Sequence, residues 1–137
     1  MSKPILCVDF DGVLHSYTSG WVEAHFIPDP PVPGALAWLL EATKHFDVKI
    51  YSSRSQQDGG IRAMATWIGY WARKELGNEA PKYPANALIN ALYGMDAWPE
   101  KKPPAFLTID NRAVCFDGDW SKLDPSALLA FKPWNKR

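Results

Sequence analysis

Two aspartates stand one residue apart, directly after a short apolar run. Residues 5–8 form the run, and Asp9, Asp11 and Gly12 follow it. An aspartate can attack a phosphoryl group as a covalent nucleophile, and a second carboxyl group can move the proton that the reaction requires. Because carboxylates repel an anionic phosphate, such a site needs a hard cation such as Mg²⁺. The alternative interpretation is that both acids only cap a surface turn, a position that aspartate favours.

Polar residues also follow two later apolar runs. They are Ser52-Ser53-Arg54 after residues 48–51, and Asp110-Asn111-Arg112 after residues 105–109. Hydroxyl groups and the backbone N–H groups of a turning chain suit phosphate oxygens. An ordinary serine-rich connection between a strand and a helix is the alternative. Ligands of open α/β sheets bind beyond the carboxyl ends of the strands, so the three polar clusters are expected to lie together.

The spacing of apolar residues predicts strands that alternate with helices. Helices are expected over residues 35–45 and 61–76, where apolar positions recur at helical spacing. Residues 86–92 are ambiguous, and we favour a short strand around Leu88 and Ile89. The other expected elements are strands at 5–8, 48–51, 105–109 and 113–116 and a helix at 125–131. The pattern predicts one α/β domain over residues 1–137, a three-layer Rossmann-like parallel sheet with helices on both faces.

Residues 16–33 are rich in proline and in aromatic side chains. The segment is too short for an inserted domain. Since it follows Asp11 closely, we expect it to flank the site as a short flap. A connector stiffened by proline is an equally good interpretation.

Composition excludes several classes of protein. The 137 residues suffice for one domain with a core, and 15 basic against 15 acidic residues give no electrostatic case for wholesale binding to nucleic acid or membranes. Cys7 and Cys115 lie in apolar runs, so buried reduced thiols are expected and no disulfide partner. Residues 1–4 form no signal peptide, and no apolar segment approaches the ~20 residues of a membrane span. These features predict a cytoplasmic protein that does not engage membranes.

Four segments, in order, resemble the motifs of the haloacid dehalogenase (HAD) superfamily of phosphohydrolases. They are residues 8–13 (Val-Asp-Phe-Asp-Gly-Val), residues 50–52 (Ile-Tyr-Ser), Lys102, and residues 109–112 (Ile-Asp-Asn-Arg). Lys102 is identified as the third-motif lysine because it stands eight positions before Asp110, with Lys101 as the alternative. The resemblance covers most of the chain and implies a HAD-like core. No segment is long enough for a large cap, which implies an open site and bulky substrates.

The resemblance also implies a role for each site residue. Asp9 would form an aspartyl-phosphate, and Asp11 would act first as general acid and then as general base. Ser52 would bind the phosphoryl group, and Lys102 would neutralise its charge. Ser53 and Arg54 are further candidates for phosphate contacts, as is Arg112. The implied cofactor is Mg²⁺, held by the side chains of Asp9 and Asp110 and by the backbone carbonyl of Asp11.

The substrate and one feature of the metal site remain open at this stage. Residues 45–54 and 110–112 resemble the 3′-phosphatase half of phage polynucleotide kinases, which makes a nucleotide or nucleic-acid end the expected substrate, and another phosphorylated small molecule the alternative. Asn111 departs from the family, which often has a second acid there. That departure favours a second function, a catalytically silent HAD-like module that binds a phosphorylated ligand or a protein partner.

Overall fold

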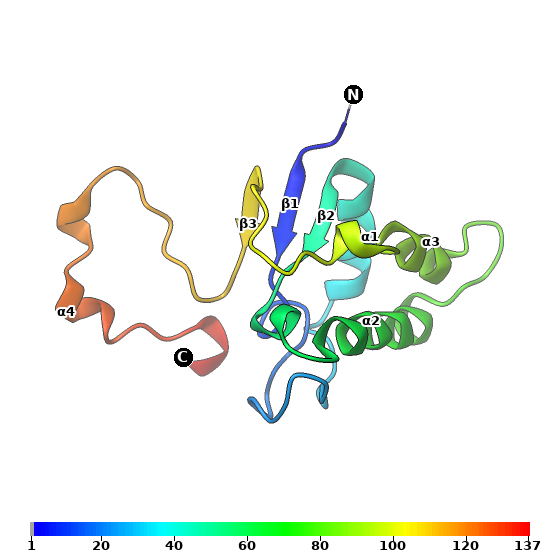
Figure 1. Cartoon of the computed structure of the whole chain (residues 1–137), viewed down its shortest axis with the longest axis horizontal. Helices are drawn as coiled ribbons and strands as arrows, with labels where there is room; N and C mark the ends of the chain where they lie inside the picture. The colour runs from blue at the N-terminus through cyan, green and yellow to red at the C-terminus, as the bar shows by residue number, and fades with distance from the viewer. Residues whose placement is uncertain (1) are drawn as a thin grey trace.

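The computed structural model describes residues 2–137 and shows an α/β fold built on an open sheet of three parallel strands. β1 (Ile5–Val8) is the central strand, with β2 (Asp47–Ile50) on one side and β3 (Leu107–Ile109) on the other (Figure 1). Because all three strands are parallel, their carboxyl ends lie at the same edge of the sheet. The predicted parallel α/β arrangement is confirmed, whereas a three-layer core of HAD type stays a prediction.

One face of the sheet carries the main hydrophobic core. The strand register places Leu6 beside Val48 and Val8 beside Ile50, so these four side chains share a face. All four are buried in one cluster with residues from the three longest helices. The helices are α1 (Ala35–His45), α2 (Gly60–Leu76) and α3 (Pro84–Ala91), and each contacts the other two.

Apolar residues at helical spacing explain the two longest helices. α1 buries Ala35, Leu36, Leu39 and Ala42, which recur at intervals of three or four residues and therefore face one side. α2 follows the same rule with Met64, Trp67, Ile68 and Ala72, and Gly77 follows its end. Gly77 has φ 67°, a conformation that glycine adopts without steric cost. The predicted helices at 35–45 and 61–76 are confirmed.

The predicted strand around Leu88 and Ile89 is wrong, because these residues belong to the helix α3. Pro84 begins the helix, where its fixed φ and missing N–H are tolerated. Ala85 and Leu88 are both buried, and this three-residue spacing fits one face of a helix. An apolar run this short fits a strand as well as a helix, so the sequence did not distinguish the two.

The predicted strand at 113–116 is also wrong. These residues have no regular secondary structure, and all four are exposed. A strand needs a partner for its backbone hydrogen bonds, and β3 is the last strand of the chain that pairs in the sheet over residues 2–137. Cys115 is consequently exposed rather than buried, whereas Cys7 in β1 is buried as predicted; both thiols are free.

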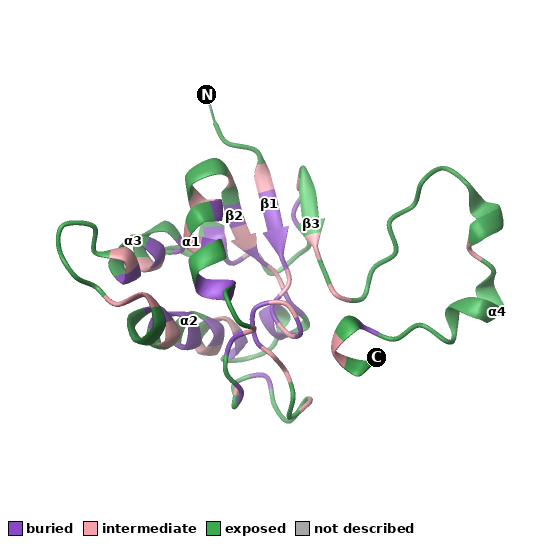
Figure 2. Ribbon diagram, turned by 180° about the vertical axis from the view of Figure 1, so that it is seen from behind, coloured by how far each residue is buried: buried purple, intermediate pink, exposed green. Residues whose placement is uncertain are grey.

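The chain after β3 makes a wide excursion away from the sheet and then returns (Figure 1). It contains the short helical turns η3 (Trp120–Lys122), α4 (Pro125–Leu128) and η4 (Trp134–Lys136), so the predicted helix at 125–131 is shorter than expected. Figure 2 shows this excursion as almost entirely exposed. In residues 2–137 no helix has the length and apolar character needed to cross a bilayer.

Candidate functional site

A small polar pocket lies where the strands end. It has a volume of about 150 Å³. Its lining residues come from the loop after β1, from the turn after β2, from the loop after β3 and from η4: Asp9, Asp11, Tyr17, Ser52, Ser53, Asn111, Arg112, Asn135 and Lys136. Hydroxyls, amides, carboxyls and cations therefore meet in one space, as expected at the carboxyl edge of a parallel sheet.

Asp9 is the most strongly perturbed of the carboxyl groups in this pocket. Burial raises its pKa to about 7, and the neighbouring carboxylates of Asp110 and Asp11 contribute to the rise. The backbone N–H of Phe10 donates to Asp9 Oδ1 at 2.8 Å, which acts in the opposite direction and fixes the orientation of the carboxyl. The Asp110 carboxyl lies within hydrogen-bonding reach of Asp9. The structure thus brings the two acids together from the ends of β1 and β3.

Gly12 makes the turn after the two aspartates possible. Its φ is 80°, and a Cβ atom at this position would clash with Nδ2 of Asn111. Both the backbone conformation and the close approach of Asn111 therefore require glycine. The contact seats the Asn111 side chain against the loop that carries Asp9 and Asp11.

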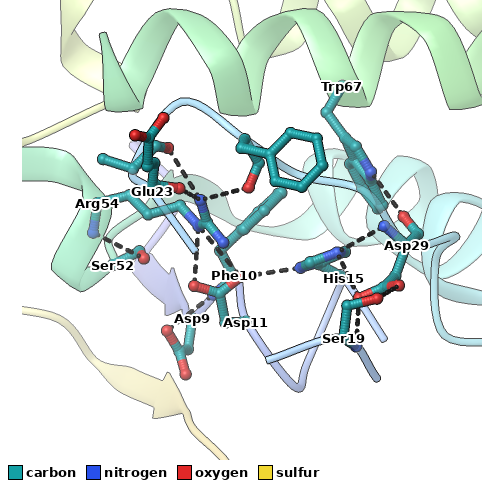
Figure 3. A network of polar contacts seen from close by, with 12 residues as sticks. Asp9, Phe10, Asp11, His15, Ser19, Glu23, Asp29, Ser52, Arg54 and Trp67 are labelled. Carbon is teal, nitrogen blue, oxygen red and sulfur yellow. Dashed lines mark hydrogen bonds and ion pairs between the residues drawn. The ribbon is translucent and has the colours of Figure 1, made fainter. Parts of the chain in front are cut away.

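Asp11 is held by two nitrogen donors (Figure 3). Arg54 Nε lies 2.9 Å from Oδ2 and 3.2 Å from Oδ1, and His15 Nδ1 lies 2.9 Å from Oδ1. His15 Nε2 accepts from the backbone N–H of Asp29 at 3.1 Å, so the ring proton must sit on Nδ1 and be donated to Asp11. The second aspartate of the pair is consequently fixed in position before any substrate arrives.

Arg54 joins the turn after β2 to the segment 16–33. Its side chain is fully buried, and Nη1 donates to the backbone carbonyls of Glu23, Ala24 and Phe26 at 2.8–3.2 Å. Its guanidinium also lies over the Trp21 ring, 4.8 Å from the centroid. These contacts anchor the loop beneath the pocket, and Arg54 is not among the residues that line the pocket. Its buried Nη2 has no hydrogen-bond partner, so a phosphate contact through Arg54 stays a prediction.

Segment 16–33 is tied to the rest of the fold at a second point. Asp29 accepts hydrogen bonds from the backbone N–H and the hydroxyl of Ser19, and these donors lower the pKa of its carboxyl although burial opposes them. The Trp67 indole N–H in α2 donates to the Asp29 carbonyl at 3.0 Å. Tyr17 of the segment lines the pocket, and a role of the whole segment as a flap stays a prediction.

Ser52 lies at the start of η1 (Ser53–Gln56), directly after β2. Its hydroxyl accepts from Arg54 N–H at 3.1 Å, and Ser55 Oγ accepts from Ser52 N–H at 3.0 Å. This reciprocal arrangement gives partners to two backbone N–H groups that have none within the helical turn. The proton of the Ser52 hydroxyl remains free for a ligand in the pocket.

The structure gathers most but not all of the residues predicted from the sequence. Asp9, Asp11, Ser52, Ser53 and Arg112 line the pocket, and Asp110 adjoins it. Lys102 is exposed and does not line the pocket. Burial raises the pKa of the Cys7 thiol, and the positive charge of Lys102 acts in the opposite direction.

Sequence reasoning missed three residues of the pocket, namely Tyr17, Asn135 and Lys136. Tyr17 has φ 60°, a strained conformation for a residue other than glycine, and such strain is often found at functional sites. Burial and the Asp11 carboxylate raise the pKa of its hydroxyl. No sequence pattern near residues 133–136 indicates a return to β1.

Among residues 2–137, no group of three or more His, Cys, Asp and Glu side chains is arranged to hold a metal ion. The predicted set differs from such a group, since it uses two carboxylates and one backbone carbonyl. Carboxylate and carbonyl oxygens are the ligands that Mg²⁺ prefers. The adjacent acids Asp9 and Asp110 fit that donor set.

Comparison of the chain with protein-family models, with curated proteins and with solved structures found no match. The function of the chain is therefore inferred from the geometry of the pocket.

Proposed function

We propose that this chain is a Mg²⁺-dependent phosphomonoesterase of HAD type that works through an aspartyl-phosphate on Asp9. The observation that carries the proposal is the half-buried Asp9 carboxyl, which lies beside the exposed Asp110 and shares one pocket with Asp11 and Ser52. Burial of Asp9 and the charges of Asp110 and Asp11 all oppose its ionisation, so this arrangement of acids costs stability when no cation is bound. The proposal includes a HAD-like core with helices on both faces of the sheet.

The raised pKa of Asp9 supports a cation site. Burial and the neighbouring acids oppose its ionisation, so a nearby positive charge would favour the carboxylate that has to attack phosphorus. Mg²⁺ held by Asp9, Asp110 and the Asp11 carbonyl would supply that charge and would offset the negative charge of the phosphate. The residues present therefore fit the cofactor implied by the resemblance.

The proposed reaction has two steps on the protein's own residues. In the first, an Asp9 oxygen attacks phosphorus, the bond from phosphorus to the leaving oxygen breaks, and Asp11 gives that oxygen a proton. In the second, Asp11 takes a proton from water, which attacks the phosphorus of the aspartyl-phosphate and releases inorganic phosphate and free Asp9. In both steps the Ser52 hydroxyl donates a hydrogen bond to a phosphoryl oxygen and keeps its proton. Arg54 and His15 keep Asp11 in position.

The proposed substrate is the phosphorylated end of a nucleotide or nucleic acid. The net charge of the chain is zero, so affinity for such a substrate has to come from local groups. Arg112 lines the pocket and supplies one local positive charge. The role of Lys102 as the neutralising lysine remains part of the proposal, although its side chain does not line the pocket.

Turnover of an aryl phosphate, with Mg²⁺ or with a chelator, tests the proposal. We expect Mg²⁺-dependent release of phosphate that Asp9→Asn abolishes and that Asp11→Asn reduces by about 10²–10⁴-fold, the usual contribution of a general acid or base. Asp117→Asn is the matched control, because Asp117 is an exposed acid paired with Lys122 outside the pocket. A panel of nucleotides, sugar phosphates and 3′-phosphorylated oligonucleotides then identifies the substrate.

A catalytically silent module that binds a phosphorylated ligand is the second candidate function. The observation that favours it is the contact of the buried Arg54 with both oxygens of Asp11, which competes with proton transfer by that carboxyl. Asn111 in the pocket wall points the same way. Binding of inorganic phosphate without turnover under any divalent metal would establish this alternative and overturn the enzymatic proposal.

A further inference from the structure

A segment far along the chain closes the pocket at the end of β1. The indole N–H of Trp134 donates to the backbone carbonyl of Gly12 at 2.7 Å, which joins positions 122 residues apart. Residues 113–132 between these regions are exposed (Figure 2), with Leu123 partly covered. The hydrogen bond to Gly12 therefore places η4 directly beside the loop that carries Asp9 and Asp11.

Asn135 and Lys136 both belong to the lining of the pocket. Asn135 Oδ1 is buried and has no hydrogen-bond partner. A buried amide group without a partner is costly, and an amide can present either its oxygen or its NH₂ group to a ligand. Lys136 lines the same pocket and brings a positive charge to it. Both groups are thus available to a molecule that enters from solvent.

The charge balance of the pocket indicates what that molecule is. Asp9 and Asp11 repel an anion, whereas Lys102 and Arg54 do not line the pocket. Arg54 Nε and Nη1 are hydrogen-bonded to Asp11 and to three carbonyls, and its buried Nη2 has no partner. The cationic side chains that do line it are Arg112 and Lys136. An anionic phosphate group therefore has one of its two direct cationic contacts in the segment 133–136.

We propose that Asn135 and Lys136 are substrate-binding residues that contact the oxygens of the phosphate group in this pocket. The inference rests on the proposed function, and it adds η4 to the groups that neutralise the charge of the phosphate, a role that the resemblance implies for Lys102. Trp134 is a positioning residue, because its hydrogen bond to Gly12 holds the segment in place.

The size of the pocket narrows the class of substrate. Its volume of about 150 Å³ is several times the ~30 Å³ that one water molecule occupies in the liquid, but it is below the ~300 Å³ at which sites for whole organic ligands begin. A phosphate group with a cation fits this space, whereas a nucleoside does not. The substrate accordingly presents a terminal phosphate, and the rest of it lies outside the pocket.

Calorimetric titration of inorganic phosphate in the presence of Mg²⁺ tests this assignment without requiring turnover. We expect Lys136→Met to weaken phosphate binding by about 10- to 100-fold, the usual effect of losing a charged hydrogen bond, and Lys136→Arg to retain most of the affinity. Lys132→Met is the matched control, because this exposed lysine lies in the same part of the chain and outside the pocket. Trp134→Phe keeps an aromatic side chain but removes the pyrrole ring with the N–H that donates to Gly12, and we expect weaker phosphate binding from it as well.

The outcomes separate this inference from the enzymatic proposal. If Lys136→Met and Asn135→Ala bind phosphate and turn over an aryl phosphate like the unaltered protein, while Asp9→Asn is inactive, the enzyme stands and the role of η4 is refuted. If the unaltered protein binds phosphate without turnover and Lys136→Met weakens that binding, the role of η4 stands in a silent module. If the unaltered protein turns over an aryl phosphate but does not bind inorganic phosphate, the enzyme stands and the role of η4 is refuted. If it neither binds phosphate nor turns over an aryl phosphate, both proposals are refuted.

Discussion

Replacement of Asp9 by asparagine should make the metal-free protein more stable at neutral and alkaline pH. The substitution keeps the size of the side chain and an oxygen that can accept from Phe10 N–H, but it removes the ionisable group. Because burial and the acids at 110 and 11 oppose ionisation of Asp9, the folded protein carries a cost that the asparagine variant does not. A residue needed for activity would thus reduce stability.

The magnitude and the pH range of this effect follow from the pKa of Asp9. A rise from the ordinary value of 3.8 to about 7 corresponds to about 4 kcal/mol against ionisation in the folded state, at ~1.4 kcal/mol per pH unit. Below pH ~4 the group is protonated in both states and costs nothing. Between pH 4 and 7 only the unfolded chain releases the proton, so stability falls as the pH rises, and above pH 7 the loss is complete.

Urea denaturation in a chelator at pH 4 and pH 8 measures this effect. We expect Asp9→Asn to exceed the unaltered protein by about 2–4 kcal/mol at pH 8 and to match it near pH 4. Asp110→Asn should recover only part of the difference, since burial is the largest cause of the shift. Added Mg²⁺ should stabilise the unaltered protein more than Asp9→Asn. Equal stability of the two proteins at pH 8, or a difference that does not change with pH, would refute the reasoning.

Three further predictions concern packing and the groups around Asp11. Gly60→Ala should lower the free energy of unfolding, measured with urea, by about 1–3 kcal/mol, because the new Cβ would clash with the Arg54 carbonyl oxygen. Gly69→Ala in the same helix is the control. There the nearest atom lies 3.4 Å away at the end of a flexible side chain, so this substitution should raise the free energy of unfolding by about 0.5–1 kcal/mol. Arg54→Met should cost about 3–5 kcal/mol in thermal denaturation, since it leaves the Asp11 carboxylate without its buried partner, and unchanged stability would contradict this role. His15→Phe should cost about 1–3 kcal/mol and slow turnover of an aryl phosphate, because it removes a donor to Asp11; normal kinetics would show that this hydrogen bond does not position the acid.

Local patterns sufficed for the sheet and the main helices because each of these elements buries a regular set of side chains. The rule that ligands bind at the carboxyl ends of parallel strands then placed Asp9, Asp11, Ser52 and Arg112 in one pocket. The strand predicted within residues 86–92 was wrong because a short apolar run fits a strand as well as a helix. Only the packing of α3 against α1 and α2 distinguishes the two.

The sequence does not determine whether a cation near the site faces the ligand or the protein. Arg54 follows a strand end in the same way as a phosphate-binding residue would, but three backbone carbonyls of the segment 16–33 surround it. Asn135 and Lys136 could not be predicted, since their place depends on one hydrogen bond between Trp134 and Gly12 across 122 positions. Such long-range contacts leave no periodic trace in the sequence.

The excursion between Arg112 and Pro133 starts and finishes at the same pocket. The entropy of closing a flexible loop rises only with the logarithm of its length, by about 0.6 kcal/mol for each doubling. Extra residues inserted near Gly118, which has open space around it, would therefore lengthen the loop without displacing either anchor. A reporter peptide could therefore be inserted in this loop. For the same reason the length of the loop could vary between related proteins without a change in the pocket residues at its two ends.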